Sequence, residues 1–120
     1  MRRVLVADDT ASSRVLVRTV LEHQGYEVIE AADGAEALAK ALENPPDLIL
    51  LDIQMPALDG FAVIERLRAE VRFAATPVVA LTASAMQGDR ERALAAGFSG
   101  YITKPIRLAA LRSEVERLLG

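Results

Sequence analysis

Five side chains that could take part in one reaction lie at the ends of four short apolar runs. They are three acids, a hydroxyl and an ammonium: Asp8, Asp9, Asp52, Thr82 and Lys104. If the runs are parallel strands of one sheet, their carboxyl ends share an edge and the five side chains meet there. Carboxylates packed a few Å apart raise one another's pKa unless a cation holds them. The pattern therefore predicts a bound metal ion together with an anionic ligand or intermediate.

The composition restricts the metal to one that prefers oxygen ligands. The chain has no cysteine and one histidine, so thiolate sites and a zinc cage are excluded. Three carboxylates can hold Mg²⁺, which binds oxygen at about 2.0 to 2.1 Å and usually keeps several waters. Those waters leave room for a phosphate. We therefore expect Mg²⁺ as the cofactor, with Mn²⁺ as an alternative ion.

Each of these residues also has a simpler structural interpretation. An Asp-Asp pair after a strand can cap the next helix, a strand-end threonine can do the same, and a lone lysine is usually solvated. Asp52 favours the functional interpretation, because it ends an apolar run of a central strand. Beside the acids, Lys104 can offset their repulsion and pair with a phosphoryl oxygen, while Thr82 can donate to another.

Five apolar runs alternate with five segments of helical period. The runs occupy residues 4–7, 28–29, 48–51, 78–81 and 100–103. Strands separated by helices pair in parallel through right-handed crossovers, which gives a sheet covered on both faces. We expect an α/β fold of the flavodoxin-like type, a doubly wound five-stranded parallel sheet with five helices in a three-layer α/β/α sandwich.

The composition of each run predicts its place in the sheet. Residues 48–51 and 78–81 are almost wholly apolar, as expected for central strands buried on both faces. Glu27 and Glu30 flank the second run and mark it as an edge, and the short, mixed run at 100–103 suits the opposite edge. The predicted strand order is 2-1-3-4-5, one of the common orders of doubly wound sheets.

Length and charge limit the kind of protein. The chain has 120 residues, of which 52% are hydrophobic, so we expect one domain over residues 1–120. The formal net charge is −3 with acids and bases interspersed, which argues against direct nucleic-acid binding. No apolar stretch approaches the roughly 20 residues that span a bilayer. We expect a cytoplasmic protein that is not a membrane protein, either freestanding or excised from a longer one.

Five motifs occur in order along essentially the whole chain. They are residues 4–9 (VLVADD), 47–56 (DLILLDIQMP), 59–60 (DG), 77–83 (PVVALTA) and 101–105 (YITKP). Any one of them is weak, but the ordered set is highly specific. By these motifs the sequence resembles the receiver domains of two-component response regulators. The resemblance implies a phosphorylation-activated signalling switch rather than an enzyme that turns over a substrate.

The resemblance also implies a role for each residue of the constellation. Asp52 would accept a phosphoryl group from a phosphohistidine on a histidine kinase or a phosphotransfer protein. Asp9, Asp52 and the backbone carbonyl of Gln54 would ligate Mg²⁺ directly, and Asp8 would act mostly through bound water. Mg²⁺ and Lys104 would supply positive charge to a loose, in-line transition state. The domain would catalyse only its own phosphorylation and dephosphorylation.

The same likeness implies how phosphorylation reaches the surface. Thr82 would move toward the phosphoryl group, and Tyr101, otherwise readable as a packed edge-strand aromatic, would turn inward behind it. The surface formed by the fourth helix, the fifth strand and the fifth helix would change shape and bind a downstream protein. The domain would be a monomer or a phosphorylation-dependent homodimer. To shift the ratio of active to inactive conformation from 1:99 to 99:1, the phosphoryl group must favour the active conformation by about 5.5 kcal/mol. One charge-assisted hydrogen bond contributes about 1.5 to 3 kcal/mol, so the Lys104 contact and the repacking of Tyr101 would need to contribute as well.

Two further features rest on the resemblance alone. The bond between Lys104 and Pro105 would be a cis peptide that aims the lysine at the site. Gln54 and Ser84 would border the path of the hydrolytic water and tune the lifetime of the phosphoryl group.

Three other functions fit the chain less well. A haloacid-dehalogenase-type phosphatase also forms an aspartyl phosphate with Mg²⁺, but it needs a second Asp where this chain has Gln54. A nucleotide or flavin module lacks its Gly-rich loop here, and Asp8 and Asp9 would repel the phosphates. A degenerate receiver should have lost Asp52, Thr82 or Lys104, and all three are present.

Overall fold

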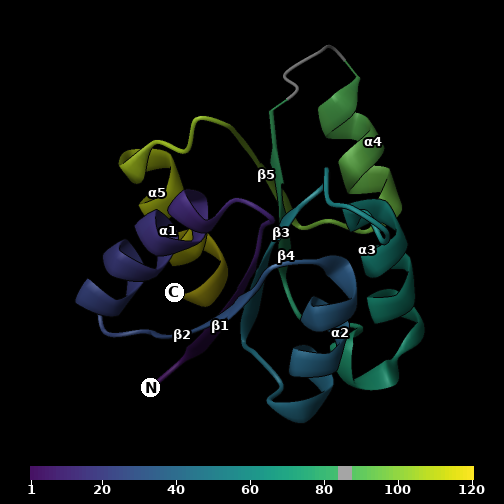
Figure 1. The fold of residues 1–120 in the computed structure, drawn as a ribbon, viewed down its shortest axis with the longest axis horizontal. Coiled ribbons are helices and arrows are strands. Elements are labelled where there is room, and N and C mark those ends of the chain that lie inside the picture. The colour runs from purple at the N-terminus through teal and green to yellow at the C-terminus, as the bar shows by residue number, and fades with distance from the viewer. Residues whose placement is uncertain (84–87) are drawn as a thin grey trace.

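A computed structural model of the chain shows one sheet with helices on both faces (Figure 1). The structure describes residues 1–83 and 88–120. The elements follow in the order β1 (Arg3–Ala7), α1 (Ala11–His23), β2 (Glu27–Ala31), α2 (Gly34–Glu43), β3 (Leu48–Asp52), α3 (Gly60–Ala69), the short 3₁₀ helix η1 (Val71–Phe73), β4 (Val78–Thr82), α4 (Asp89–Ala96), β5 (Gly100–Thr103) and α5 (Leu108–Leu119).

The five strands are parallel and lie in the order β2-β1-β3-β4-β5, which confirms the predicted fold class and order. The register sets the edge at which the strands end. Ala7 of β1 pairs with Leu51 of β3, so Asp8 is level with Asp52. Thr82 ends β4 opposite Thr103 of β5, which brings Lys104 to the same edge of the sheet.

The alternation of side chains along the strands divides the core into two layers. Leu5 and Ala7 of β1 belong to the layer under α2, α3 and α4, whereas Val4 and Val6 face α1 and α5. Figure 1 shows α1 and α5 on one side of the sheet and the other three helices on the opposite side. All residues of β3 and β4 are buried, as the apolar runs predicted. Both layers thus hold the site-bearing strand ends in a fixed position.

Residues that end the strands belong to the sheet itself. Asp52 is the last residue of β3, still paired with Leu81, and Thr82 is the last residue of β4. In the sequence both residues lie just beyond the apolar runs. The end of an apolar run shows where the side chains become polar, whereas the backbone pairing of the strand continues for one more residue. None of the helices in the described part of the chain combines the length and apolar content needed to cross a bilayer.

Gly60 allows the start of α3 to pack directly on the chain that leaves β3. Its N–H donates to the Ile53 carbonyl oxygen at 2.9 Å, and the preceding Asp59 caps the helix by accepting from the Ala62 N–H at 2.9 Å. A Cβ at residue 60 would lie 2.7 Å from Ile53 Cα and 2.8 Å from the Asp52 carbonyl oxygen. Both neighbours are backbone atoms, so only glycine fits without moving the segment that follows Asp52.

We predict that Gly60→Ala lowers the free energy of unfolding by about 1 to 3 kcal/mol, the usual cost of overpacking a tight site. Urea unfolding followed by circular dichroism measures the change. Gly25→Ala is the control, because Gly25 has φ +93° and open space around it and carries only the left-handed backbone penalty of about 1 to 2 kcal/mol. A Gly60→Ala protein as stable as the wild type would show that the close approach is not required.

Candidate metal centre

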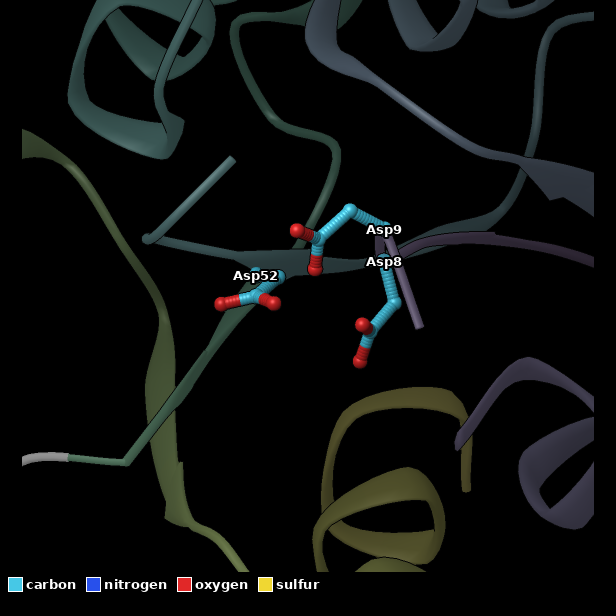
Figure 2. Close-up of side chains that lie close together, drawn as sticks. All are labelled: Asp8, Asp9 and Asp52. Atoms are coloured by element: carbon cyan, nitrogen blue, oxygen red, sulfur yellow. The ribbon is translucent and has the colours of Figure 1, made fainter. Parts of the chain in front are cut away.

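Three carboxylates gather where β1 and β3 end (Figure 2). Asp8 and Asp9 directly follow β1, and Asp52 closes β3. One carboxylate oxygen from each residue lies within 4.8 Å of the others. Asp8 is fully buried and Asp52 is 3% exposed, whereas Asp9 is exposed to solvent. The parallel register therefore brings the three acids together around one space that opens to water on the side of Asp9.

The Lys104 ammonium lies against this cluster. Its Nζ is 2.8 Å from Asp8 Oδ2 and 2.9 Å from Asp52 Oδ2. The backbone N–H of Lys104 donates to the Thr82 carbonyl oxygen at 2.6 Å, which continues the β4–β5 pairing by one residue. The peptide bond between Lys104 and Pro105 is cis. One cation thus faces two buried anions at the edge of the sheet.

Each buried carboxylate has one oxygen held by the backbone. Asp52 Oδ1 accepts from the Gln54 N–H at 3.0 Å, and Asp8 Oδ1 accepts from the Thr10 N–H at 2.9 Å. Asp8 Oδ2 meets the ammonium as an ion pair, but it accepts no well-aligned hydrogen bond from the described residues. A buried polar atom without a hydrogen bond usually has a further partner, such as an ion or a water molecule. Oxygen donors of this kind suit Mg²⁺ or one of its waters.

The electrostatics of the cluster oppose full ionisation. Burial raises the pKa of the Asp52 carboxyl above its ordinary value, and the neighbouring Asp8 raises it further, although hydrogen bonds from Lys104 and Gln54 pull it down. Burial on its own lowers the pKa of the Lys104 ammonium, but its contacts with Asp8 and Asp52 outweigh burial and leave that pKa raised. Lys104 therefore stays charged at neutral pH, while ionisation of Asp52 is less favourable than it is for a carboxyl in water.

A second group of residues lines a cavity of about 170 Å³ next to the acids. Its lining includes Gln54, Thr82 and Tyr101 of β5. Thr82 is 3% exposed. Burial raises the pKa of the Tyr101 hydroxyl, and the charge of Asp89 on α4 adds to this shift. The hydroxyl and the aromatic ring singled out in the sequence therefore share one cavity.

Several residues around the site were not found from the sequence. The Arg92 guanidinium of α4 lies 4.3 Å from the centroid of the Phe61 ring on α3, and both line the same cavity. Arg14 of α1 donates to the Asp8 carbonyl oxygen at 2.6 Å. These contacts join separate elements, and no short motif signals them. Ser84, predicted to tune the phosphoryl lifetime, lies outside the described residues.

The raised pKa of Asp52 leads to a stability prediction for the metal-free protein. A carboxyl whose pKa is higher in the folded chain stabilises the fold at low pH and loses that contribution as pH rises through the folded-state pKa. Asp52→Asn removes this loss, and Lys104 keeps its ion pair with Asp8. In EDTA the variant should be more stable than the wild type by about 1 kcal/mol or more at pH 7.

Urea unfolding measured from pH 4 to pH 7 tests this, and the advantage of Asp52→Asn should grow with pH. Asp59→Asn is the matched control, because Asp59 is an exposed helix cap that does not belong to the carboxylate cluster and the substitution should bring no gain. An Asp52→Asn protein less stable than the wild type at pH 7 would contradict this account of the cluster.

Comparison with known proteins identifies the family. Residues 4–116 match the response regulator receiver domain. The chain is 39% identical over 119 residues to the polar-differentiation response regulator DivK of Brucella ovis and Brucella abortus, covering 99% of this chain and 97% of theirs. The similarity to DivK therefore extends over nearly the full length of both proteins.

Solved structures agree. The chemotaxis response regulator CheY4 of Vibrio cholerae has a TM-score of 0.93 and 36% identity, with 98% of each chain covered. The receiver domain of the sensor histidine kinase PA1611 from Pseudomonas aeruginosa, solved with a magnesium ion coordinated in the active-site cleft, has a TM-score of 0.90 and 35% identity, with 99% of this chain and 98% of that chain covered. The chain belongs to the receiver domains of response regulators, the phosphoacceptor switches of two-component signalling.

Proposed function

We propose that residues 1–120 form one receiver domain in which Asp52 is the residue that takes up the phosphoryl group. The observation that carries this assignment is the position of Asp52 in the cluster. It is 3% exposed, its Oδ2 meets the Lys104 ammonium at 2.9 Å, and its Oδ1 accepts from the Gln54 N–H. Asp8 and Asp9 lie within ligand distance of it. Asp8 has equivalent contacts with Lys104 and with the Thr10 N–H, but it is fully buried. Asp52 ends β3 next to Ile53 and Gln54, which line a cavity, and it is therefore the acid that an incoming phosphoryl group can reach.

The transfer needs few groups besides these. An Asp52 carboxylate oxygen attacks the phosphorus of a phosphohistidine, so that a P–O bond forms, the P–N bond breaks, and the electron pair returns to the imidazole nitrogen. Charge spreads over the equatorial oxygens of the phosphoryl group in the transition state. Lys104, freed from Asp52, pairs with one of these oxygens. Attack of water on phosphorus later releases inorganic phosphate and restores the carboxylate, and the domain catalyses only these two steps on itself.

Mg²⁺, as in receiver domains generally, would neutralise the carboxylates and the incoming phosphoryl oxygens. The oxygen donors present to hold it are the carboxylates of Asp8, Asp9 and Asp52 and the backbone carbonyl of Gln54. The buried Asp8 Oδ2, which lacks a well-aligned hydrogen bond from the described residues, supports a ligand at this place. Mn²⁺ favours the same hard oxygen donors and should replace Mg²⁺.

The switch would run through the cavity beside the site. Thr82 and Tyr101 both line it, so a move of the threonine hydroxyl toward a phosphoryl group changes the space open to the tyrosine ring. Tyr101 also borders a larger cavity of about 420 Å³ between β5 and α5, together with Arg107 and Glu114. Repacking of Tyr101 would alter that surface. Gln54, which lines the smaller cavity, would tune the lifetime of the phosphoryl group, as Ser84 would.

The partners follow from this scheme. Receiver domains interact with histidine kinases and with downstream targets. For this chain we propose a sensor histidine kinase or a histidine phosphotransfer protein as the donor, and a downstream protein that binds the surface formed by α4, β5 and α5. The domain would act as a monomer or as a homodimer once phosphorylated.

We predict that Asp52→Ala abolishes labelling by acetyl phosphate, since Asp8 is fully buried and the exposed Asp9 makes no ion pair with Lys104 within the described part of the chain. Intact-protein mass spectrometry measures the added phosphoryl group. Asp59→Ala, which alters an exposed helix cap, should still be labelled. EDTA should block labelling of both the wild type and the control. Undiminished labelling of Asp52→Ala would reject the assignment.

We also predict that Lys104→Ala binds Mg²⁺ at least as tightly as the wild type, because the ammonium occupies the same oxygens, but loses the phosphorylation-dependent change at the surface. Amide NMR shifts of β5 and α5 with acetyl phosphate and Mg²⁺ are the measurement. Lys40 is the only other lysine, so Lys40→Ala is the matched control and should respond as the wild type does. Wild-type shifts in Lys104→Ala would exclude this role for the lysine.

A further inference from the structure

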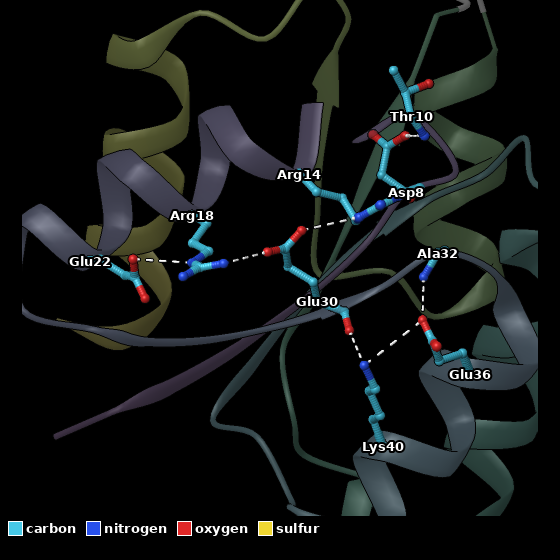
Figure 3. A network of polar contacts seen from close by, with 9 residues as sticks. All are labelled: Asp8, Thr10, Arg14, Arg18, Glu22, Glu30, Ala32, Glu36 and Lys40. Atoms are coloured by element: carbon cyan, nitrogen blue, oxygen red, sulfur yellow. Dashed lines mark hydrogen bonds and ion pairs between the residues drawn. The ribbon is translucent and has the colours of Figure 1, made fainter. Parts of the chain in front are cut away.

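Arg14 connects the metal centre to a charged network on α1 and β2 (Figure 3). Its Nη1 donates to the Asp8 carbonyl oxygen at 2.6 Å, and its Nε donates to Glu30 Oε1 at 3.1 Å. The other Glu30 oxygen accepts from Arg18 Nη1 at 3.0 Å, and Arg18 Nε donates to Glu22 at 3.2 Å. Arg14 is thus fixed at both ends of its guanidinium, with the backbone of a metal-site residue on one side.

The Asp8 carbonyl lies where β1 has just ended. The Asp8 N–H still donates to the Ala31 carbonyl oxygen of β2 at 3.1 Å, but in the described part of the chain the Asp8 carbonyl takes its hydrogen bond from the Arg14 side chain. A peptide group is planar. A contact that fixes this carbonyl therefore fixes the plane of the peptide group between Asp8 and Asp9. These two residues are the ones that contribute carboxylates from this loop.

The charge of Arg14 is offset locally. Arg14 and Arg18 face Glu30 and Glu22, so two positive and two negative groups form the network. The hydrogen bond from Arg18 lowers the pKa of Glu30 most; burial opposes it and Arg14 reinforces it, so Glu30 remains ionised at neutral pH. Arg14 therefore adds little net positive charge beside a site that must attract Mg²⁺, and its contribution is geometric.

We propose that Arg14 is a positioning residue for the metal centre: it holds the Asp8–Asp9 peptide so that both carboxylates face the ion, and Glu30 holds Arg14. This inference rests on the proposed Mg²⁺ site. Mg²⁺ requires near-octahedral geometry at about 2.0 to 2.1 Å, whereas Ca²⁺ tolerates irregular arrangements at about 2.3 to 2.6 Å. A loosened peptide should therefore weaken Mg²⁺ binding more than Ca²⁺ binding.

Arg14 affects the affinity for Mg²⁺ in two opposite ways, through its positive charge and through its hydrogen bond to Asp8. Removing a positive charge near the acids would by itself raise the affinity for a divalent cation. Removing the hydrogen bond to Asp8 lowers it, and groups that hydrogen-bond metal ligands are commonly worth about 10- to 100-fold in affinity. We expect Arg14→Met to bind Mg²⁺ about tenfold more weakly than the wild type. Methionine keeps an unbranched apolar stem and donates no hydrogen bond.

Arg18→Met is the matched control. It also removes one arginine of α1 and one ion pair with Glu30, but Arg18 does not contact Asp8. Isothermal titration of Mg²⁺ and of Ca²⁺ into the full chain gives both affinities, and urea unfolding in EDTA compares the stability of the two variants. Arg18→Met should keep its Mg²⁺ affinity within about twofold of the wild type, since it loses no hydrogen bond to the site. The ratio of Mg²⁺ to Ca²⁺ affinity should fall only in Arg14→Met.

Arg14→Lys provides a second test should the methionine variant fail to fold. A single ammonium can reach the carbonyl or Glu30 but lacks the guanidinium fork, so we expect an intermediate Mg²⁺ affinity. If Arg14→Met or Arg14→Lys binds Mg²⁺ as tightly as Arg18→Met, the inference is wrong and the proposed function stands. If the wild type itself binds no Mg²⁺, the proposed metal site fails and this inference fails with it.

Discussion

The contact of one lysine ammonium with two buried carboxylates of a three-carboxylate cluster is the interaction on which the other features of the site depend. Lys104 Nζ meets the two buried acids at 2.8 and 2.9 Å and compensates only part of their charge. Burial keeps the pKa of Asp52 raised even with this cation beside it. Such a cluster stores unfavourable electrostatic energy that a divalent cation and a phosphoryl group can relieve. The capacity to take up a phosphoryl group is thus a consequence of incomplete neutralisation.

The rest of the fold maintains this unfavourable arrangement. Parallel pairing with Ala7 opposite Leu51 puts Asp8 level with Asp52. One apolar layer on each face of the sheet supplies the hydrophobic stabilisation that offsets the electrostatic cost of the cluster. Asp8 is held at its N–H by Ala31, at its carbonyl by Arg14, at Oδ1 by Thr10 and at Oδ2 by Lys104. These contacts, three hydrogen bonds and one ion pair, leave the buried acid little room to move away from Asp52.

The sequence was enough to predict the sheet, because apolar runs and helical periods alternate clearly and the charged flanks of the second run mark an edge. It also predicted that Asp8, Asp9, Asp52 and Lys104 meet, since the carboxyl ends of parallel strands share one edge. Arg14 on Asp8 and Arg92 on Phe61 could not be predicted in this way. Which residue a long arginine side chain reaches depends on how each helix is rotated and placed on the sheet, and short motifs do not encode that.

The central claim is that the Lys104 ammonium leaves Asp52 for a phosphoryl oxygen when the site is loaded. A crystal structure of the chain with Mg²⁺ and beryllofluoride, a mimic of the phosphoryl group, tests it most directly. The account predicts the mimic on the Asp52 carboxylate, with Lys104 Nζ in contact with the mimic and no longer with Asp52 Oδ2. A mimic on Asp8 or Asp9, or a Lys104 that still contacts both buried acids, would contradict it.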